Sequence, residues 1–414
     1  MEIDRFLYQS IKDHLLQPEI TLLIGPRQSG KTTLLKSLAA ELEQAGQSCL
    51  FFNLDIDSDA RFFGSQTQFI DRVNALTEGK RTHIFIDEVQ RIENAGLFLK
   101  GIYDRGLPHK WIATGSGSIE LKEKIAESLV GRKRNFYLYP VSPAEFVAYR
   151  VGRSIDSALA LLETDQHLAD QLLTEYMLFG GYPRVVTAPT VQEKKAVLDE
   201  LFQGYIERDI QLLLRLEKSR AFITLLQLMA NRIGRMVNYQ DLAAQTNLSV
   251  QTLKHYLWYS EKTFICEAIT PFFTNKDKEL VKTPQYYFRD CGLRNHLLDV
   301  QKIDATDPEF GFLFQQFVFL LVEHRFNSAV SSLHYWRTQH QAEVDFVVHF
   351  GSRILPIEVK SGRLDAPKIE RSLRHFIDVY QPEEAWVVNR SLTENIQVGN
   401  TTVRFMPWYA LMKP

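Results

Sequence analysis

The octapeptide GPRQSGKT at residues 25–32 follows an apolar run, ITLLIG at residues 20–25, and precedes a run with helical character, LLKSLAAELEQ at residues 34–44. It matches the pattern G-x-x-x-x-G-K-[ST] in the strand–loop–helix context that the pattern requires. In such a loop, glycines let backbone N–H groups and the helix N-terminus surround phosphate groups. Lys31 is expected to reach the β- and γ-phosphates, and the Thr32 hydroxyl to bind Mg²⁺. The stretch predicts an ATP site lined by Gly25, Pro26, Arg27, Gln28, Ser29, Gly30, Lys31, Thr32 and Thr33.

A second element, HIFIDEVQ at residues 83–90, ends an apolar strand in two neighbouring carboxylates. Asp87 suits the magnesium shell, and Glu88 suits the base that orients the attacking water. A solvated acidic strand end is the alternative, but the glycine-rich loop upstream favours a catalytic pair. Adjacent acids therefore indicate hydrolysis of the nucleotide rather than binding alone.

Two further polar features accompany these motifs. The run ATGSGS at residues 113–118 would place Thr114 or Ser116 beside the phosphates as a polar sensor, and a plain polar turn explains the run almost as well. Arg132 and Arg105 are candidates for an arginine that a neighbouring subunit donates to stabilise the charge of the transition state. A surface role is the alternative for each arginine, and the use of either one implies a homo-oligomer.

The order of apolar runs predicts the fold class. Between residues 20 and 142, the runs ITLLIG, CLFFNLD, THIFIDEV, KWIATGS and NFYLYPVS alternate with amphipathic stretches, which is typical of an α/β fold with a parallel sheet covered by helices. A period of 3.6 in AVLDELFQGYIERDIQLLL at residues 196–214 predicts a helix. The expected domains are a P-loop ATPase core at 1–150, a helical lid and connector at 151–235, a winged-helix type module at 236–283 and a second α/β domain at 284–414. The sheet of this last domain is expected to be partly antiparallel.

Bulk composition bounds the class of protein. The 414 residues are 45% hydrophobic and 24% charged, with a net charge of -2, so any contact with nucleic acid must come from a local basic patch. The first residues, MEIDRFLYQSIKDHLL, lack the features of a signal peptide, and no apolar run reaches membrane-spanning length. The three cysteines have no paired or metal-binding spacing and suit core thiols in a reducing compartment. We expect a cytoplasmic protein.

Taken in order, GPRQSGKT, FIDEVQ, TGSGS, GRKRNFYLYPVSPAEF, GGYPRVV and YIERDI resemble the AAA-type ATPases of the archaeal ATPase superfamily. The late segments YYFRDCGLRNHLL, EVDF and IEVK also fit this resemblance, which covers nearly the whole chain. It implies an ATPase core fused to a C-terminal domain of unknown function that is related to restriction endonucleases.

Two late strands are predicted to form a hairpin. QAEVDFVVHF at residues 341–350 and RILPIEVK at 353–360 are joined by Gly351 and Ser352, a loop compatible with a II′ turn. Phe350 would then oppose Arg353, and counting outward along the strands places Asp345 opposite Glu358 and Glu343 opposite Lys360. Because side chains two residues apart share a face, these four would form one polar cluster, with Val344, Phe346, Ile357 and Val359 on the other face.

Opposed carboxylates repel each other unless something compensates their charge, and Mg²⁺ or Mn²⁺ is suited to oxygen ligands from two acids. Lys360 could position or deprotonate water and stabilise negative charge on a phosphate. An acid followed by E-x-K on a hairpin resembles the PD-(D/E)XK nuclease core, in which Asp345, Glu358 and Lys360 would be the working residues. The alternative is a solvated charged face in which Glu343 pairs with Lys360.

Two features depart from this nuclease pattern. Where related cores often carry an acid on the preceding helix, FLFQQF presents Gln315 and Gln316, with Glu323 further along as a supporting acid. Pro356 lies inside the second strand, which requires a sheet edge or a position without a ladder hydrogen bond. A helix is expected after the hairpin, from Ala366 to Tyr380.

A segment with helix-turn-helix proportions, NYQDLAAQTNLSVQTLKHYLWYSEKTF, precedes the last domain, with Ser249 in N-cap position. Val250, Leu253 and Leu257 are expected to face the core, leaving Gln251, Lys254, His255 and Trp258 available to a DNA groove. Contact with DNA and a purely structural role are equally compatible with this pattern.

Together these features predict a Mg²⁺-dependent ATPase whose nucleotide state controls a nuclease-like domain acting on DNA or RNA. Two alternatives stay open. One is an ATP-switched protein that binds nucleic acid or protein without cutting it, and the other is a signalling or defence switch that oligomerises on ATP binding.

Overall fold

The computed structural model describes residues 3–117, 129–205, 219–273, 283–326, 330–338 and 341–413. Within these ranges, no helix combines the length and the apolar character needed to cross a membrane. The chain divides into two compact units. Unit 1 comprises Met1–Pro140, Gly204–Arg215 and Lys262–Phe264, and unit 2 comprises Val141–Gln203, Leu216–Glu261 and Ile265–Pro414.

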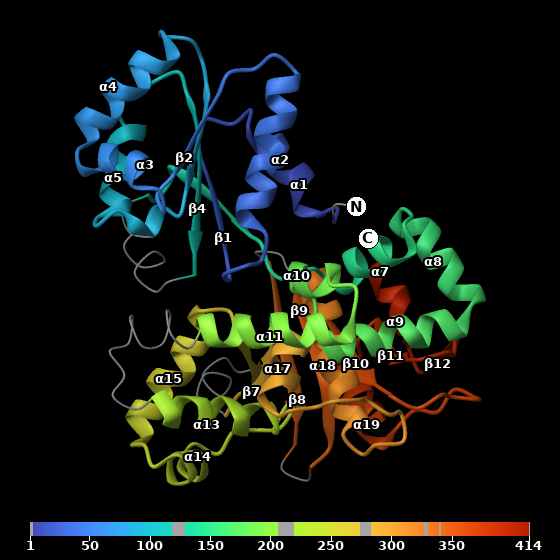
Figure 1. The fold of residues 1–414 in the computed structure, drawn as a ribbon. Helices are drawn as coiled ribbons and strands as arrows, with labels where there is room; N and C mark the ends of the chain where they lie inside the picture. Colours follow the sequence, from blue (N-terminus) through green and yellow to red (C-terminus); the bar gives the residue numbers. More distant parts are fainter. Residues whose placement is uncertain are drawn as a thin grey trace. The chain divides into compact units, whose positions relative to one another are not determined.

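Unit 1 is built on a five-stranded sheet in the order β2-β3-β4-β1-β5 (Figure 1). Its strands are β1 (Ile20–Gly25), β2 (Cys49–Asn53), β3 (His83–Asp87), β4 (Lys110–Ser116) and β5 (Lys133–Tyr137). All neighbouring strands run parallel, which confirms the predicted parallel α/β core. The loops that follow β1, β3 and β4 therefore meet at one edge of the sheet.

Helices cover both faces of this sheet (Figure 1). The residues of α1 (Leu7–His14) and α2 (Lys31–Gln44) pack on one face, and those of α4 (Gln66–Thr77) and α5 (Ala95–Tyr103) pack on the other. The described part of unit 1 also contains the short helical segments α3 (Asp57–Ala60), η1 (Arg61–Gly64) and η2 (Val89–Arg91).

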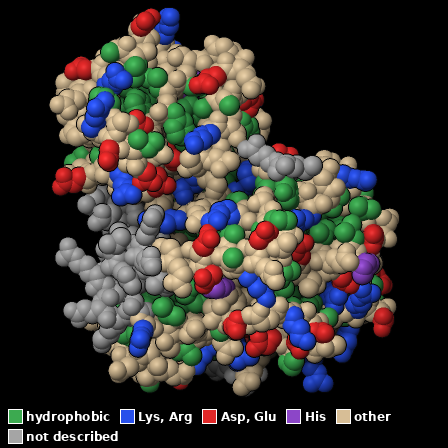
Figure 2. All heavy atoms as spheres, viewed as in Figure 1, with side chains coloured by type: hydrophobic (Ala, Val, Ile, Leu, Met, Phe, Trp, Pro, Cys, Tyr) green, Lys and Arg blue, Asp and Glu red, His purple; other side chains and the backbone are tan. Residues whose placement is uncertain are grey.

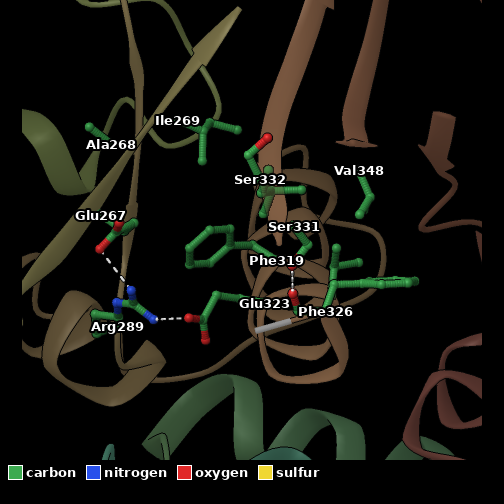
Figure 3. A pocket seen from close by; sticks show the side chains of 12 residues that line it. Glu267, Ala268, Ile269, Arg289, Phe319, Glu323, Phe326, Ser331, Ser332 and Val348 are labelled. Carbon is green, nitrogen blue, oxygen red and sulfur yellow. Dashed lines mark hydrogen bonds and ion pairs between the residues drawn. The ribbon is translucent and has the colours of Figure 1, made fainter. Parts of the chain in front are cut away.

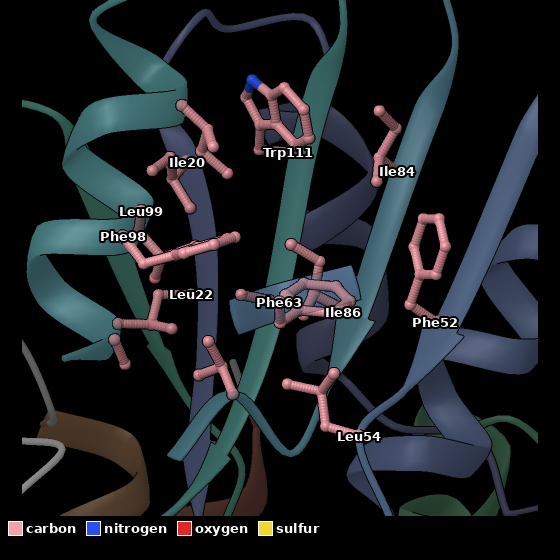
Figure 4. Close-up of a cluster of buried hydrophobic side chains, with 14 of the residues drawn as sticks. Ile20, Leu22, Phe52, Leu54, Phe63, Ile84, Ile86, Phe98, Leu99 and Trp111 are labelled. Carbon is pink, nitrogen blue, oxygen red and sulfur yellow. The ribbon is translucent and has the colours of Figure 1, made fainter. Parts of the chain in front are cut away.

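The core of unit 1 explains why its three central strands, β1, β3 and β4, are largely apolar. Successive side chains of a strand point to opposite faces of the sheet. Leu22 therefore packs with Phe98 and Leu99 on the face that α4 and α5 cover (Figure 4), whereas Leu23 packs with Leu35 on the face that α1 and α2 cover. Strands buried on both faces need apolar residues at every position. All six residues of β1, ITLLIG, are buried, and the hydroxyl of its one polar side chain, Thr21, is hydrogen-bonded to His14 Nδ1 at 2.8 Å.

The other helices of the described residues lie wholly or mainly in unit 2. They are α7 (Pro143–Val151), α8 (Ile155–Thr164), α9 (Gln166–Phe179), α10 (Pro183–Thr187), α11 (Val191–Tyr205), α13 (Ser219–Ala230), α14 (Tyr239–Thr246), α15 (Val250–Lys262), α17 (Cys291–Leu297), α18 (Phe310–Phe326), α19 (Arg371–Tyr380) and η4 (Trp408–Met412). The last residues of α11 and α15 belong to unit 1. Residues 206–214 of the predicted helical run, and with them most of the YIERDI motif, lie outside the described residues.

An eight-stranded sheet in the order β12-β13-β11-β10-β9-β8-β6-β7 forms the other part of unit 2. The strands are β6 (Cys266–Pro271), β7 (Gln285–Phe288), β8 (Ser331–Arg337), β9 (Glu343–Phe350), β10 (Arg353–Val359), β11 (Glu384–Asn389), β12 (Glu394–Val398) and β13 (Thr401–Pro407). The pairs β6–β8, β10–β11 and β11–β13 are parallel and the other neighbours antiparallel. The predicted partly antiparallel sheet is therefore confirmed, and β6, from the segment expected to form a winged-helix type module, is one of its strands.

Helices α18 and α19 pack on this sheet. Helix α19 buries Leu373 and Phe376 in a cluster with Val347 and Val387. Helix α18 is buried continuously from Leu313 to Val322, as expected of a helix that is apolar on all sides. The helix predicted from Ala366 begins only at Arg371, and Glu370 before it is still extended, at ψ 156°. Ala366 precedes Pro367, and helical backbone angles are disfavoured for a residue before proline.

A buried aspartate joins two distant segments of unit 2. Asp290, the N-cap of α17, accepts a hydrogen bond from Leu293 N–H at 2.8 Å and one from Gly181 N–H at 2.7 Å. Gly180 adopts φ +72°, and a Cβ there would lie 2.3 Å from Asp290 Oδ1. Burial raises the pKa of Asp290 to about 6. Asp290 thus links the GGYP turn at Gly180–Pro183 to the RDCG segment at Arg289–Gly292.

Charges are mixed over the surface. On the face shown in Figure 2, Lys and Arg side chains are interspersed with Asp and Glu side chains over both units. This distribution agrees with the net charge of -2 for the whole chain.

Candidate functional site

The loop of residues 25–32 has the backbone of a phosphate-binding turn. Gly25 ends β1, and a Cβ at this position would lie 2.1 Å from Leu138 O, so only glycine fits. Gly30 is the N-cap of α2 at φ +97°, and Gln28 also adopts positive φ, +57°. The turn therefore delivers the chain directly into the N-terminus of α2, where backbone N–H groups favour an anion.

The loop side chains lie where the motif predicts them. Lys31 is buried, and its Nζ donates to Pro26 O at 2.7 Å and to Gly25 O at 3.1 Å. Ser29 Oγ also donates to Pro26 O, at 2.9 Å. Thr32 is half-buried and Thr33 exposed. The ammonium group of Lys31 is thus held inside the loop, where phosphate oxygens would bind.

Strand β3 brings its acid to the loop. Thr32 Oγ1 donates to Asp87 Oδ2 at 2.8 Å, and the hydroxyl of Thr114 on β4 donates to Asp87 Oδ1. Asp87 is 1% exposed. Thr114 Oγ1 also accepts from Glu88 N–H at 3.1 Å. The structure therefore brings together Thr32, Asp87 and Thr114, which the sequence had placed on three separate elements.

Sequence reasoning missed one member of this site. Gln90, in η2, donates from Nε2 to Glu88 and to Ser116 Oγ, the latter at 2.9 Å. Its Oε1 accepts from Ser116 N–H at 3.3 Å. The signal that could have found it is its position two residues after Glu88 in DEVQ, directly beyond the buried strand.

The structure does not bring the candidate arginines to the nucleotide site of their own chain. Arg132 O accepts from Ile20 N–H at 2.9 Å, at the end of β1 opposite the loop. Arg132 Nε contacts Asp104 Oδ1 at 2.6 Å, and this hydrogen bond raises the pKa of the guanidinium. Arg105 is exposed. A role of either arginine in a neighbouring subunit stays a prediction.

The hairpin in unit 2 has the predicted register over its first five pairs. Phe350 pairs with Arg353, and the pairing continues to Phe346 with Ile357, where the ladder ends before the predicted pairs Asp345–Glu358 and Glu343–Lys360. Gly351 adopts φ +61°, as the first central position of a II′ turn requires. The pairing of β10 with β11 begins at Ile357, so the missing N–H of Pro356 falls before that ladder.

Val344 and Phe346 of β9 were predicted to share one face of the sheet, and this prediction is wrong. Val344 lies in the core that α19 covers, whereas the ring of Phe346 contacts Tyr287 at 5.4 Å and Phe319 of α18 at 6.3 Å. The cause is a register shift in the β8–β9 pairing between His334 and Trp336. Such a bulge breaks the two-residue repeat locally.

The three predicted working residues do converge. Asp345 Oδ2 accepts from Val359 N–H at 2.7 Å, and Asp345 Oδ1 accepts from Gln315 Nε2 at 3.0 Å. Lys360 Nζ donates to Glu358 Oε1 at 2.9 Å. The other carboxylate oxygen of Glu358 is buried, and no donor to it lies among the described residues.

Burial governs the charges of this cluster. It raises the pKa of Asp345 well above its usual value, and the charge of Glu358 adds to the effect. The pKa of Glu358 is also raised, mainly by burial and in spite of Lys360. Burial alone would lower the pKa of Lys360, but attraction to Glu358 outweighs it, so the pKa is raised. Two carboxylates in this setting favour a shared cation.

Beyond the effect of burial, Glu343 lies close enough to the cluster for its charge to raise the pKa of Asp345 and of Glu358. Glu343 does not pair with Lys360, because its carboxylate contacts Arg337 Nη1 at 2.9 Å and Gln285 Nε2 at 2.8 Å. Lys360 instead contacts Glu358 and, at 4.0 Å, Glu370.

Glu323 lies away from the cluster. Its carboxylate contacts Arg289 Nη1 at 2.7 Å beside a cavity of about 240 Å³, where Arg289 also contacts Glu267 at 2.7 Å (Figure 3). Glu323 is eight residues after Gln315 on α18, roughly 12 Å along the helix axis. Gln315 is the helix residue that reaches Asp345, as its position in FLFQQF suggested.

The helix-turn-helix prediction is confirmed in its helices and cap. Ser249 Oγ accepts from Thr252 N–H at 3.1 Å before α15, and Leu253 and Leu257 are buried. Val250 is 37% exposed and not part of the core, because it opens the helix one turn before packing begins at Leu253. The residues proposed for a groove are outside the core: Gln251, Lys254 and His255 are exposed, and Trp258 is partly buried with its ring 5.7 Å from that of His255.

Uncharacterized proteins of Mycobacterium tuberculosis and Mycobacterium bovis are each 30% identical to this chain over 362 residues, covering 86% of this chain and 73% of theirs. The chain belongs to the same family as these proteins. An uncharacterized protein of Methanocaldococcus jannaschii is 24% identical over 385 residues, covering 90% of this chain and 81% of its own length.

Three family models match separate parts of this family member. An AAA domain matches residues 17–147, and two domains of unknown function, DUF8612 and DUF4143, match residues 170–304 and 310–411. The chain therefore carries an AAA-type ATPase domain in unit 1. The model that includes Asp345, Glu358 and Lys360 is the second domain of unknown function.

Solved structures show weaker likeness. The replication initiator DnaA bound to AMPPCP and single-stranded DNA is 13% identical with a TM-score of 0.31, covering 63% of this chain and 89% of that one. A katanin self-assembly structure is 16% identical with a TM-score of 0.25, covering 36% of this chain and 56% of that one. Similarity at this level carries no argument about the function of this chain.

Proposed function

We propose that unit 1 binds ATP with Mg²⁺ and hydrolyses it. The hydrogen bond of 2.8 Å between Thr32 Oγ1 and Asp87 Oδ2 carries the proposal. It places a hydroxyl of the phosphate-binding loop and a carboxylate at the end of β3 at one point, and both are hard oxygen donors of the kind Mg²⁺ prefers. Magnesium bound there would neutralise charge on the β- and γ-phosphates.

Other side chains of unit 1 supply the remaining groups that ATP hydrolysis requires. Lys31, held against Pro26 O and Gly25 O, would transfer its hydrogen bonds to phosphate oxygens. Glu88, directly after Asp87, would orient the attacking water and accept its proton. Thr114 fixes the Asp87 carboxylate and the backbone of Glu88 at the same time.

The test is phosphate release from ATP by the intact chain with and without Mg²⁺. Lys31→Ala should weaken nucleotide binding, and Glu88→Gln should bind a fluorescent ATP analogue normally while losing at least about 100-fold in kcat. Lys36→Ala, an exposed lysine of the same helix, is the matched control and should behave as the wild type. Equal phosphate release by the wild type and Lys31→Ala would contradict the proposal.

A second function is favoured by a separate observation. We propose metal-dependent cleavage of phosphodiester bonds at Asp345, Glu358 and Lys360 because the buried Oε2 of Glu358 finds no donor within the described ranges, beside the half-buried carboxylate of Asp345. An orphaned buried oxygen is costly unless a ligand satisfies it.

The residues fit a hard divalent cation held mainly by two carboxylates and water. No group of three or more His, Cys, Asp or Glu side chains able to hold a metal occurs among the residues that the structure describes. Mg²⁺ commonly keeps several waters and needs only one or two carboxylates. Asp345 and Glu358 would hold the ion, which would activate water, and the ammonium of Lys360 would stabilise charge on the phosphate.

Cleavage of single- and double-stranded DNA and RNA, with Mg²⁺ or Mn²⁺ and with or without ATP, tests this site. Activity should disappear in Asp345→Ala and Glu358→Gln, and its response to Lys31→Ala would show whether ATP governs it. Glu384→Gln, which removes a carboxylate of β11 bonded to Arg404, is the control. Loss of activity in this control as well would point to a damaged sheet rather than a site.

Metal binding has its own readout. A cation that binds only the folded protein, at 100-fold its Kd, adds about 2.7 kcal/mol to stability, or about 5 to 10 °C in Tm. The shift should be present in the wild type and absent in Asp345→Asn. Metal stabilisation without cleavage would favour the alternative function, an ATP-switched binding protein.

The remaining alternative, oligomerisation driven by ATP, is tested by measuring the mass of the protein in solution. If ATP drives oligomerisation, as in a signalling or defence switch, the mass measured by light scattering should rise with ATP and Mg²⁺ in the wild type and not in Lys31→Ala. A constant monomer mass would exclude both this alternative and a trans role for Arg132.

A further inference from the structure

Gln90 uses every hydrogen-bonding atom of its amide in the nucleotide site. The two N–H bonds of Nε2 go to the Glu88 carboxylate and to Ser116 Oγ, and Oε1 accepts from Ser116 N–H. A primary amide has two donors and one carbonyl acceptor, so no alternative assignment satisfies all three partners. With the amide reversed, its oxygen would face the Glu88 carboxylate, which repels it, and its NH₂ group would face the Ser116 N–H.

The bond to Gln90 fixes the carboxylate of Glu88. Glu88 adopts φ +60°, a left-handed backbone conformation that costs energy for a residue with a side chain. Its N–H is tied to Thr114 Oγ1 at 3.1 Å. Gln90 engages Oε2, and within the described ranges no side chain bonds to Oε1, so its lone pairs can accept from a water molecule. The carboxylate is thus bound at one oxygen, and the other oxygen is left for the attacking water.

The same amide also sets the direction of the Ser116 hydroxyl. Because Ser116 Oγ accepts from Gln90 Nε2 at 2.9 Å, its own proton must point to another acceptor. Ser116 ends β4, next to β1 and the phosphate-binding loop. An acceptor on the nucleotide or its attacking water would meet a hydroxyl that is already oriented as a donor.

We propose that Gln90 is a positioning residue for ATP hydrolysis that holds Glu88 and orients Ser116 as a hydrogen-bond donor. The inference rests on the proposed ATPase function of unit 1. Gln90 acts through its two neighbours and needs no contact with the nucleotide. Its loss therefore lowers kcat and leaves nucleotide binding intact.

The experiment compares Gln90→Glu, Gln90→Asn and Gln90→Ala with the wild type in steady-state ATP hydrolysis and in binding of a fluorescent ATP analogue. Gln90→Glu keeps the shape but replaces both donors with a carboxylate beside Glu88, so kcat should fall at least about 100-fold, the lower end of general-base contributions. KM and analogue affinity should stay within about threefold. Gln90→Asn, which keeps the amide, should recover part of the loss that Gln90→Ala shows.

A double-mutant cycle with Ser116→Ala separates a positioning role from damage to the fold. Ser116→Ala should cost less in the Gln90→Ala background than in the wild type, because the amide acts through that hydroxyl. Gln68→Glu, the same change at an exposed position of α4, should leave kcat unchanged.

Two failures are distinguishable. If the wild type releases no more phosphate than Lys31→Ala, the proposed ATPase function fails and this inference fails with it. If the wild type is active and Gln90→Glu keeps its kcat within threefold, or if the losses appear in KM, the ATPase function stands and the role of Gln90 is overturned.

Discussion

Replacing Asp290 with asparagine should make the free energy of unfolding less dependent on pH. The Asp290 carboxyl is fully buried, and its pKa of about 6 lies above the usual value of 3.8. A carboxyl with a raised pKa in the folded state gives stability that is complete below pH 3.8 and is lost as the pH rises through about 6. The difference of about 2.2 units corresponds to roughly 3 kcal/mol, of which about 1.4 kcal/mol is lost between pH 5 and pH 8.

Asparagine cannot ionise but also lacks one of the two acceptors. Asp290 Oδ2 accepts from Gly181 N–H, and an NH₂ group in its place would face that donor. At pH 5 the variant should therefore be less stable than the wild type by about 1 to 3 kcal/mol. At pH 8 this deficit should shrink by about 1.4 kcal/mol, because only the wild type bears the cost of a buried charge.

Urea unfolding followed by tryptophan fluorescence is a suitable assay. Four of the five tryptophans lie in unit 2, namely Trp258, Trp336, Trp386 and Trp408. Asp165→Asn is the matched control, because Asp165 caps α9 through Leu168 N–H at 2.9 Å from an exposed position where its charge stays in water. A difference between Asp290→Asn and the wild type that does not change from pH 5 to pH 8 would refute the reasoning.

Packing gives two further predictions, both measured by urea unfolding. Gly292→Ala should cost at least about 2 kcal/mol, because a Cβ there would lie 2.0 Å from Phe179 O. Gly204→Ala in α11, where a Cβ would meet no described atom within 4 Å, should be neutral or stabilising by up to about 1 kcal/mol. Leu373→Ala should cost about 2 to 5 kcal/mol, since the side chain is 0% exposed, and Val379→Ala, at a position 54% exposed on the same helix, should stay within about 0.5 kcal/mol. Equal effects of the two members of either pair would contradict the packing argument.

The parts of the fold that follow from local rules could be predicted from the sequence. The central strands of unit 1, β1, β3 and β4, are buried along their whole length and come from largely apolar runs. Gly351 fixes the register of the hairpin next to the turn, because its φ allows that turn. The bulge near Trp336 could not be predicted, because it depends on how β8 pairs with β9 rather than on either strand alone. The late start of α19 carried a local signal in Pro367 that the apolar period outweighed.

The candidate sites also contain some residues whose positions could be predicted from the sequence and others whose positions could not. Lys31, Thr32 and Asp87 come together because a motif encodes the loop and the strand that position them. Gln90 was missed because its role depends on η2 turning its side chain back toward β4. Glu323 was misplaced because sequence alone does not show which turn of α18 lies beside the hairpin, and that turn carries Gln315.

Because Asp345 Oδ2 accepts a hydrogen bond from Val359 N–H, this aspartate has a structural role in the sheet that does not depend on any metal or substrate. A relative that had lost catalysis would still be selected to keep an acceptor at this position. Its retention across relatives is therefore weak evidence of activity. Among the residues that the structure describes, nothing donates to Glu358 Oε2, so this oxygen has no comparable structural role. In a lineage that had lost the chemistry but kept the fold, Glu358 and Lys360 would therefore be replaced earlier than Asp345.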